Sequence, residues 1–357
     1  MPTPLMRRTF RRRRLAGAVI ALAVILALWA AVTALRGGIG LPVWAGAGGE
    51  AVLTAPPAAG ASRAPSPDLM PATHTRFRRG DDWRHVAKVI AYYLHNAPKR
   101  RFVYLLGGSA ARECTASDAG WRREIRALSG RSAMAFNLGT TGQSFDDEIS
   151  IVRRLPEKPS IIFIGVNLGL YTHHPSAAPS TSTGRVARAV LAAEQDRTPL
   201  TATYAQHRFT GTQVASAEKK GALLTEWLTS TYPLYQERFA YHAERLRTLV
   251  AVCQARGFRP VLLNLPLNLT AIGSRLDEPR ARYAADCQAV AAEFGIPYVD
   301  WVPTMGLVDS DFVDNWHLVE PGRAKWQRRL SGLTVSLLER YDMVPGTREG
   351  SGSPASQ

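Results

Sequence analysis

From residue 81 onward the chain alternates short, continuous apolar runs with longer stretches in which apolar residues recur at helical spacing. A continuous apolar run predicts a strand buried on both faces, because a strand with one solvated face alternates apolar and polar residues. Five such runs end at Leu106, Leu138, Val166, Leu265 and Asp300. Strands of this kind, separated by helices, predict an α/β fold with a five-stranded parallel sheet.

The intervening stretches predict helices that cover both faces of this sheet. They run over residues 81–95, 121–128, 145–155, 235–256, 279–294 and 321–341. Asp81 or Asp82 can cap the first helix. Residues 171–231 break the alternation, because they form a long insertion rich in Ser, Thr, Ala and Pro. Helical spacing near 186–195 and 222–228 within it favours a partly ordered lid.

The first 36 residues differ in character from the rest of the chain. Leu15 to Leu35 is a run of 21 uncharged residues, mostly apolar. At about 1.5 Å per residue this run spans a hydrocarbon core of roughly 30 Å. Six arginines lie between Arg7 and Arg14. Their position before the run predicts a single-pass membrane anchor with a cytoplasmic N-terminus and an extracytoplasmic body. The alternative is a cleaved signal peptide with a site near Ala45-Gly46-Ala47.

Composition divides the chain into four predicted segments. Residues 1–36 are the basic segment and anchor, and residues 37–72, rich in Gly, Ala, Pro and Ser, form a flexible linker. Residues 73–344 form one α/β domain, which is long enough to bury the core of a catalytic domain. Residues 345–357 resemble the linker in composition and form a disordered tail.

Charge and cysteine content narrow the function classes. The formal net charge is +15, and +8 remains once the seven arginines of residues 1–36 are set aside. A basic body favours anionic envelope polymers or acidic lipid headgroups. Nucleic-acid binding is disfavoured, because no zinc spacing or helix-turn-helix signature accompanies the charge. Cys253 and Cys287 lie in helical patterns, where buried free thiols are favoured over a disulfide; Cys114 has no CxxC partner.

Candidate chemistry begins where the first predicted strand ends. The string FVYLLGGSAARE places Ser109 directly after a buried strand and two glycines, with a helix starting behind it. This position exposes the hydroxyl above the sheet and places the backbone N–H near the positive end of the helix, where an oxyanion would be stabilised. The alternative role for Ser109 is a helix N-cap. Arg112-Glu113 follow it, and a structural ion pair is favoured over substrate steering.

The string DNWH, Asp314 to His317, supplies the complementary groups. A D-x-x-H spacing on a turn lets the carboxylate bind the imidazole Nδ1–H, so that Nε2 can take a proton from serine. Pro321 then opens the last helix. The alternative is a surface turn with an ordinary histidine.

Two further strand ends carry donors for a developing oxyanion. NLGTTGQS contains Asn137, Gly139 and Gly142, and IGVNLG contains Gly165 and Asn167. Turns and caps are the alternative roles for these residues. His173-His174 and His207 lack ligand partners at metal spacing and are interpreted as solvated loop histidines.

The order Ser109, Gly142, Asn167 and Asp314-x-x-His317 resembles the four blocks of the SGNH (GDSL) hydrolase superfamily. The resemblance spans residues 102–338 and implies a three-layer, flavodoxin-like fold. It also implies a Ser-His-Asp triad of Ser109, His317 and Asp314, and an oxyanion hole made by Ser109, Gly142 and Asn167. No metal or organic cofactor is implied.

This chain departs from the family pattern in two blocks, where GGS replaces GDS and GVNL replaces G-x-N-D. Those aspartates normally brace the loops of the site. With its anchor, the chain is similar to the SGNH proteins that work beside membrane O-acyltransferases. It is therefore expected to act on short acyl esters of envelope polysaccharide or of a lipid-linked substrate. The alternative is an inactive SGNH module that binds envelope glycan or scaffolds a membrane O-acyltransferase.

Overall fold

The structure is a computed structural model that describes residues 81–95, 101–174, 179–195 and 207–341. The predicted anchor, linker and tail lie outside these residues. No helix among the described residues is long and apolar enough to cross a bilayer.

The centre of the domain is a five-stranded parallel sheet, as predicted, and its strands lie in the order β2-β1-β3-β4-β5. The strands are β1 (Phe102–Leu106), β2 (Met134–Asn137), β3 (Ser160–Val166), β4 (Arg259–Asn264) and β5 (Tyr298–Val299). β1 and β3 are buried along their whole length. Continuous apolar runs are required there because helices cover both faces.

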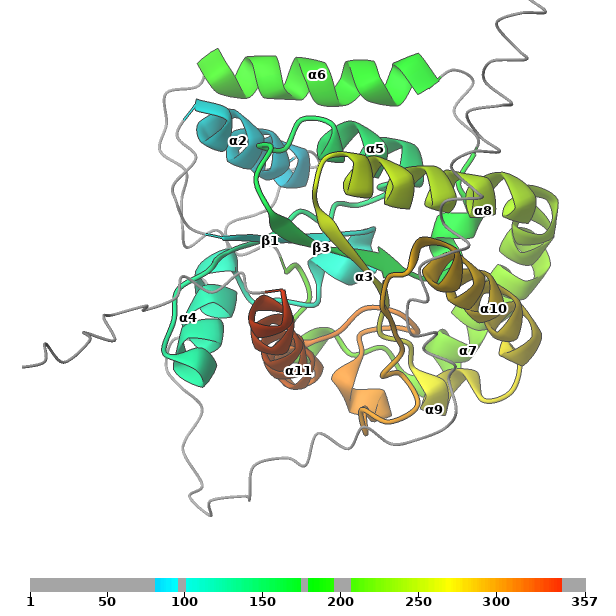
Figure 1. Ribbon diagram of the computed structural model, residues 1–357. Helices are drawn as coiled ribbons and strands as arrows, with labels where there is room; N and C mark the ends of the chain where they lie inside the picture. Colours follow the sequence, from blue (N-terminus) through cyan, green and yellow to red (C-terminus); the bar gives the residue numbers. More distant parts are fainter. Residues whose placement is uncertain (1–80, 96–100, 175–178, 196–206, 342–357) are drawn as a thin grey trace, which may run out of the picture. The chain divides into compact units, whose positions relative to one another are not determined.

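Helices form one layer on each side of the sheet (Figure 1). Phe102 and Tyr104 of β1 face a core shared with α2 (Asp81–His95), α5 (Phe145–Val152), α8 (Tyr232–Ala255) and α10 (Asp277–Phe294). Val103 and Leu105 face a second core with α3 (Ser109–Arg112), α4 (Asp118–Ser129) and α11 (Glu320–Arg340). The three-layer α/β/α arrangement is confirmed. The first predicted helix has the predicted ends, 81–95, and the other predicted helices are present with one or both ends shifted by a few residues.

The insertion contains more regular structure than its composition predicts. After the 3-10 turn η2 (Leu168–Thr172) comes α6 (Pro179–Gln195), which lies outside α2 and α5 (Figure 1). The second part contains η3 (Gly211–Gln213), α7 (Ala217–Glu226) and the π-turn η4 (Trp227–Thr231). The short helix α9 (Leu269–Ile272) and the 3-10 turn η5 (Asp309–Asp311) follow later in the chain.

Candidate active site

The candidate nucleophile lies on a sharp turn between β1 and α3. Gly107 has φ 140°, and a Cβ there would lie 2.6 Å from the Cβ of Ala111, so only glycine fits. Gly108 is the N-cap position, and Ser109 is the first residue of α3. Ser109 is therefore not the cap of this helix. The turn leaves its hydroxyl half-buried at the carboxyl end of the sheet.

Asp314 and His317 lie on a tight loop between β5 and α11. The N–H of Val313 donates to the carbonyl of His317, and Phe312 pairs with Leu318 in an antiparallel bridge. Within the loop, Oδ1 of Asp314 accepts the N–H groups of Trp316 and His317 at 2.8 and 2.9 Å. The D-x-x-H spacing thus closes a turn that fixes the carboxylate beside its own histidine.

An unbroken chain of hydrogen bonds links the three side chains. Nδ1 of His317 lies 2.7 Å from Oδ2 of Asp314, and Nε2 lies 2.8 Å from Oγ of Ser109. Burial alone would raise the pKa of Asp314. Hydrogen bonds and charge from His317, with two backbone N–H groups, outweigh burial and lower this pKa. An ionised Asp314 accepts the Nδ1–H, which leaves Nε2 to accept the serine proton.

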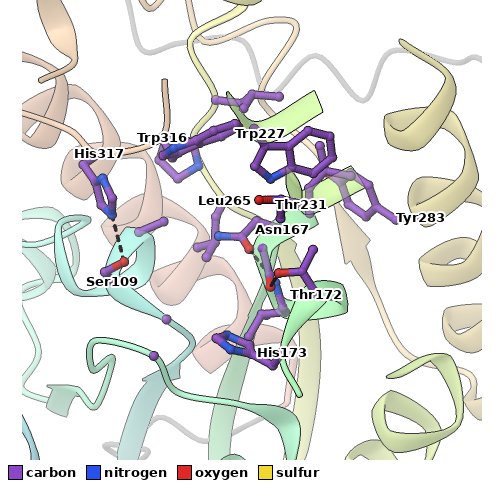
Figure 2. A pocket seen from close by; sticks show the side chains of 18 residues that line it. Ser109, Asn167, Thr172, His173, Trp227, Thr231, Leu265, Tyr283, Trp316 and His317 are labelled. Atoms are coloured by element: carbon purple, nitrogen blue, oxygen red, sulfur yellow. Dashed lines mark hydrogen bonds between the residues drawn. The ribbon is translucent and has the colours of Figure 1, made fainter. Parts of the chain in front are cut away.

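These groups open onto a cavity of about 270 Å³ (Figure 2). The cavity is also lined by Gly142 and Asn167, which the sequence analysis names as candidate oxyanion donors. Oδ1 of Asn167 accepts the N–H of Leu170 at 3.1 Å, so its Nδ2 donor is turned toward the pocket. Gly142 has φ +67°, a backbone conformation that glycine adopts without strain.

The other oxyanion candidates have structural roles. Nδ2 of Asn137 donates to the carbonyl of Ala111 and to Thr115, at 2.8 and 2.9 Å. A Cβ at Gly139 or Gly165 would lie 2.6 or 2.8 Å from backbone atoms of the β1 to α3 segment. Both glycines therefore allow close chain contact rather than facing the cavity.

Two side chains brace the loops around Ser109 and Gly142. Oε1 of Gln143 accepts the N–H of Gly107 at 2.8 Å, while its Nε2 donates to the carbonyl of Leu138. Asp82 of α2 accepts the N–H of Thr141 and contacts Arg112 at 3.2 Å. Asp82 is therefore a brace and not the predicted helix cap. These contacts hold the loops that carry Ser109 and Gly142 in place.

A buried charge cluster lies behind Ser109. Glu113, with a fully buried side chain, contacts Arg112 at 2.8 Å and Arg323 of α11 at 2.9 Å. Arg323 also donates to the carbonyl of Leu318, directly after His317. Burial lowers the pKa of Arg323, and the charge of Glu113 partly offsets this effect. The predicted structural role of Arg112-Glu113 is confirmed, and Arg323 extends the pair to the histidine loop.

The second described part of the insertion, residues 207–231, contacts the same site. Nζ of the buried Lys220 lies 2.8 Å from Oδ1 of Asp309, and Asn315 donates to the carbonyl of Lys220. The ring of Phe209 lies 5.2 Å from the imidazole of His317, centre to centre. Sequence reasoning missed these contacts, because neither Lys220 nor Phe209 belongs to a motif.

The structure also shows the surroundings of His207 and of the cysteines. His207 is not a solvated histidine, since its Nδ1 lies 2.8 Å from the carbonyl oxygen of Ala116 and burial lowers its pKa. The three cysteines are buried free thiols, as favoured. Burial raises the pKa of Cys287 to about 12, so this thiol stays protonated.

Comparison with known proteins gives distant structural matches. No protein-family model and no curated protein matches the chain. The solved structure of TesA aligns over 67% of this chain and 100% of its own, at 14% identity and a TM-score of 0.40. A GDSL-like lipase from Bacteroides thetaiotaomicron aligns over 72% and 99%, at 11% identity and a TM-score of 0.37.

The Bacillus subtilis protein YXIM aligns over 68% of this chain but only 57% of its own length, at 14% identity and a TM-score of 0.36. Similarity at this level carries no conclusion about what this chain does. Its activity has to be inferred from its own site.

Proposed function

We propose that this chain is a serine esterase or O-acyltransferase of the SGNH type, with Ser109, His317 and Asp314 as its catalytic triad. The observation that carries the proposal is the hydrogen-bond chain from Oγ of Ser109 through His317 to Asp314, at the mouth of a cavity. Serine is a weak nucleophile until a base removes its proton, and this arrangement supplies the base and orients it.

In the proposed reaction, Oγ of Ser109 attacks the ester carbonyl carbon while Nε2 of His317 takes the hydroxyl proton. The N–H groups of Ser109 and Gly142, with Nδ2 of Asn167, stabilise the oxyanion. Collapse breaks the bond to the leaving alcohol, which receives the proton from His317. Water or a sugar hydroxyl then attacks the acyl-enzyme by the same steps in reverse, and free Ser109 is restored.

The proposed substrates are short acyl esters of cell-envelope carbohydrate. Two features support this choice: a cavity of about 270 Å³, at the small end of ligand pockets, and a net charge of +8 beyond residue 36. The proposed location is the outer side of the cell membrane, held by the apolar run of residues 15–35. A membrane O-acyltransferase is the proposed partner.

Kinetics on an aryl acetate test the triad. We expect Ser109→Ala and His317→Ala each to abolish turnover without additivity, because triad members act as one unit. Asp314→Asn should keep the fold and lower kcat by about 10⁴-fold, since the imidazole is left in the wrong tautomer. Wild-type activity in Ser109→Ala would refute the assignment. Complete inactivity of a folded wild-type chain on all esters would favour the inactive module.

Reporter fusions test the location. Alkaline phosphatase fused at Pro345 should be active, because that enzyme folds only outside the cytoplasm. Activity only from a cytoplasmic reporter at the same position would contradict the proposed topology.

A further inference from the structure

The cavity next to Ser109 is markedly aromatic along one wall. Trp227, Tyr283 and Trp316 line it there, and we call these three residues the aromatic arm. Figure 2 shows Trp316 between His317 and Trp227 at the top of the view, Tyr283 beyond Asn167 as seen from Ser109, and Thr172 and His173 at the bottom. An ester bound with its carbonyl oxygen at Asn167 thus has an apolar side and a polar side available.

A π-turn brings Trp227 to this wall. The N–H of Tyr232 donates to the carbonyl of Trp227, five residues earlier, where a regular helix would use the fourth. Pro233 follows, and a proline inside a helix lacks an N–H and clashes with the carbonyl four residues before it. The widened turn accommodates this proline. It also places Trp227 and Thr231 on the same pocket wall.

The arm is held in place by packing from three separate elements. Trp227 is 8% exposed, and its ring lies 6.1 Å from that of Trp316, which precedes His317. Tyr283 of α10 donates a hydrogen bond to Asn264 at the end of β4. Leu265 and Leu267 complete the apolar lining. Packed interiors yield little. A wall held by these contacts therefore excludes groups that are larger than the space beside it.

We propose that the aromatic arm is the acyl-binding pocket, and that Trp227 ends it and limits the acyl chain to a few carbons. This inference rests on the proposed function and adds to it the residue that sets chain length. The insertion thereby contributes the specificity element of a site whose reacting groups come from elsewhere in the chain.

A series of p-nitrophenyl esters from acetate to octanoate tests the proposal on the full chain. In the wild-type protein kcat/KM should fall with chain length. Trp227→Ala should raise the octanoate-to-acetate ratio of kcat/KM by about tenfold or more, since each accommodated methylene is worth about fourfold. Trp227→Leu keeps apolar packing and should give a smaller rise. Tyr92→Ala, on the exposed surface of α2, is the control and should leave the ratio unchanged.

Fluorophosphonate labelling of Ser109 in every variant separates the possible failures. Labelled variants with an unchanged ratio would overturn the acyl role of Trp227 and leave the proposed activity intact. An equal rise in KM for all ester chain lengths in Trp227→Ala would also overturn it. That result would indicate that the ring of Trp227 contacts the alcohol part of the ester and not the acyl chain. A folded chain without any labelling would contradict the proposed activity, and the acyl pocket with it.

Discussion

The two described parts of the insertion between β3 and α8 are held to the domain in different ways. The first part, α6, rests on α2 and α5 through apolar side chains such as Val186 and Val190. The second part, residues 207–231, also buries Leu224 and Trp227 in this core. In addition it is tied by polar bonds: Arg208 N–H to Glu113, Ala215 N–H to the carbonyl of Val313, and Lys220 to Asp309.

This difference separates a covering role from a site-forming role. Apolar packing is non-directional and stabilises the fold without fixing single atoms. Hydrogen bonds and buried ion pairs fix position. In the second part, those of Ala215 and Lys220 end on the segment that carries Asp314 and His317, and that of Arg208 ends on Glu113, close to Ser109 in the chain. We therefore expect changes in residues 207–231 and in their partners to alter activity, and changes in α6 to alter stability alone.

The largest expected effect is a loss of stability at the charge cluster of Arg112, Glu113 and Arg323. This cluster accepts a hydrogen bond from the second part, since Glu113 accepts the N–H of Arg208. Glu113→Gln leaves Arg323 buried without its carboxylate, and breaking such a pair costs about 3–5 kcal/mol of unfolding free energy. Denaturant titration of the purified chain measures this loss. Arg280→Gln breaks an exposed pair with Asp277 and serves as the control, with an expected loss below about 1 kcal/mol. Equal losses of unfolding free energy in the two variants would show that the buried cluster stabilises the fold no more than an exposed pair.

The next effect separates activity from stability. Lys220→Met keeps an apolar stem but removes the bonds to Asp309, at a cost of about 1–3 kcal/mol. We expect kcat/KM on an aryl acetate to fall about tenfold as the loop of Asp314 and His317 loses this anchor. Full activity in a destabilised variant would show that residues 207–231 do not support the site.

The matched change in the first part is Val190→Ala. Val190 is 6% exposed on α6, and its truncation should cost about 1–2 kcal/mol. Because α6 packs mainly on α2 and α5, kcat/KM should remain at the wild-type value. A loss of activity as large as that of Lys220→Met would remove the distinction between the two parts.

The smallest expected effect is a pH dependence of local stability that is confined to residues 207–231. Burial would raise the pKa of Asp309, but hydrogen bonds from Lys220 and Asn268 outweigh it and lower the pKa below its ordinary value. A group with a depressed folded pKa stabilises the folded state above its unfolded pKa, and this contribution is lost as the pH falls through the folded value.

Pepsin cleavage followed by mass spectrometry can locate this effect. Between about pH 5 and about pH 2, cleavage within residues 207–231 should increase before cleavage within α6. Lys220→Met should abolish the difference. Simultaneous cleavage of both parts in the wild-type chain would contradict the prediction.

The sheet and the hydrogen-bonded arrangement of Ser109, His317 and Asp314 could be predicted from sequence because their signals are local. Each strand is a continuous apolar run, and D-x-x-H brings Asp314 and His317 together within one turn. Ser109 required only one further step, since the carboxyl ends of parallel strands share one edge of the sheet. The order of motifs along the chain was therefore sufficient to bring these three residues together.

The supporting residues could not be predicted, because their partners are distant in the chain. Asp82 and Thr141, or Glu113 and Arg323, have no spacing that relates them. From composition, the insertion was interpreted as a partly ordered lid rich in Ser, Thr, Ala and Pro, and no residue of it was predicted to form the site, yet it supplies Trp227 to the cavity wall. Pro233 was the available signal, since a proline after a helical stretch indicates a distorted turn.

Active-site labelling tests most directly whether Ser109 is an activated nucleophile. The full chain is treated with a fluorophosphonate, and the modified peptide is identified by mass spectrometry. We predict one adduct per chain at Ser109, lost in Ser109→Ala and strongly slowed in His317→Ala, because only a serine activated by its base reacts. A folded chain with no adduct, or with its adduct at another serine, would contradict the triad.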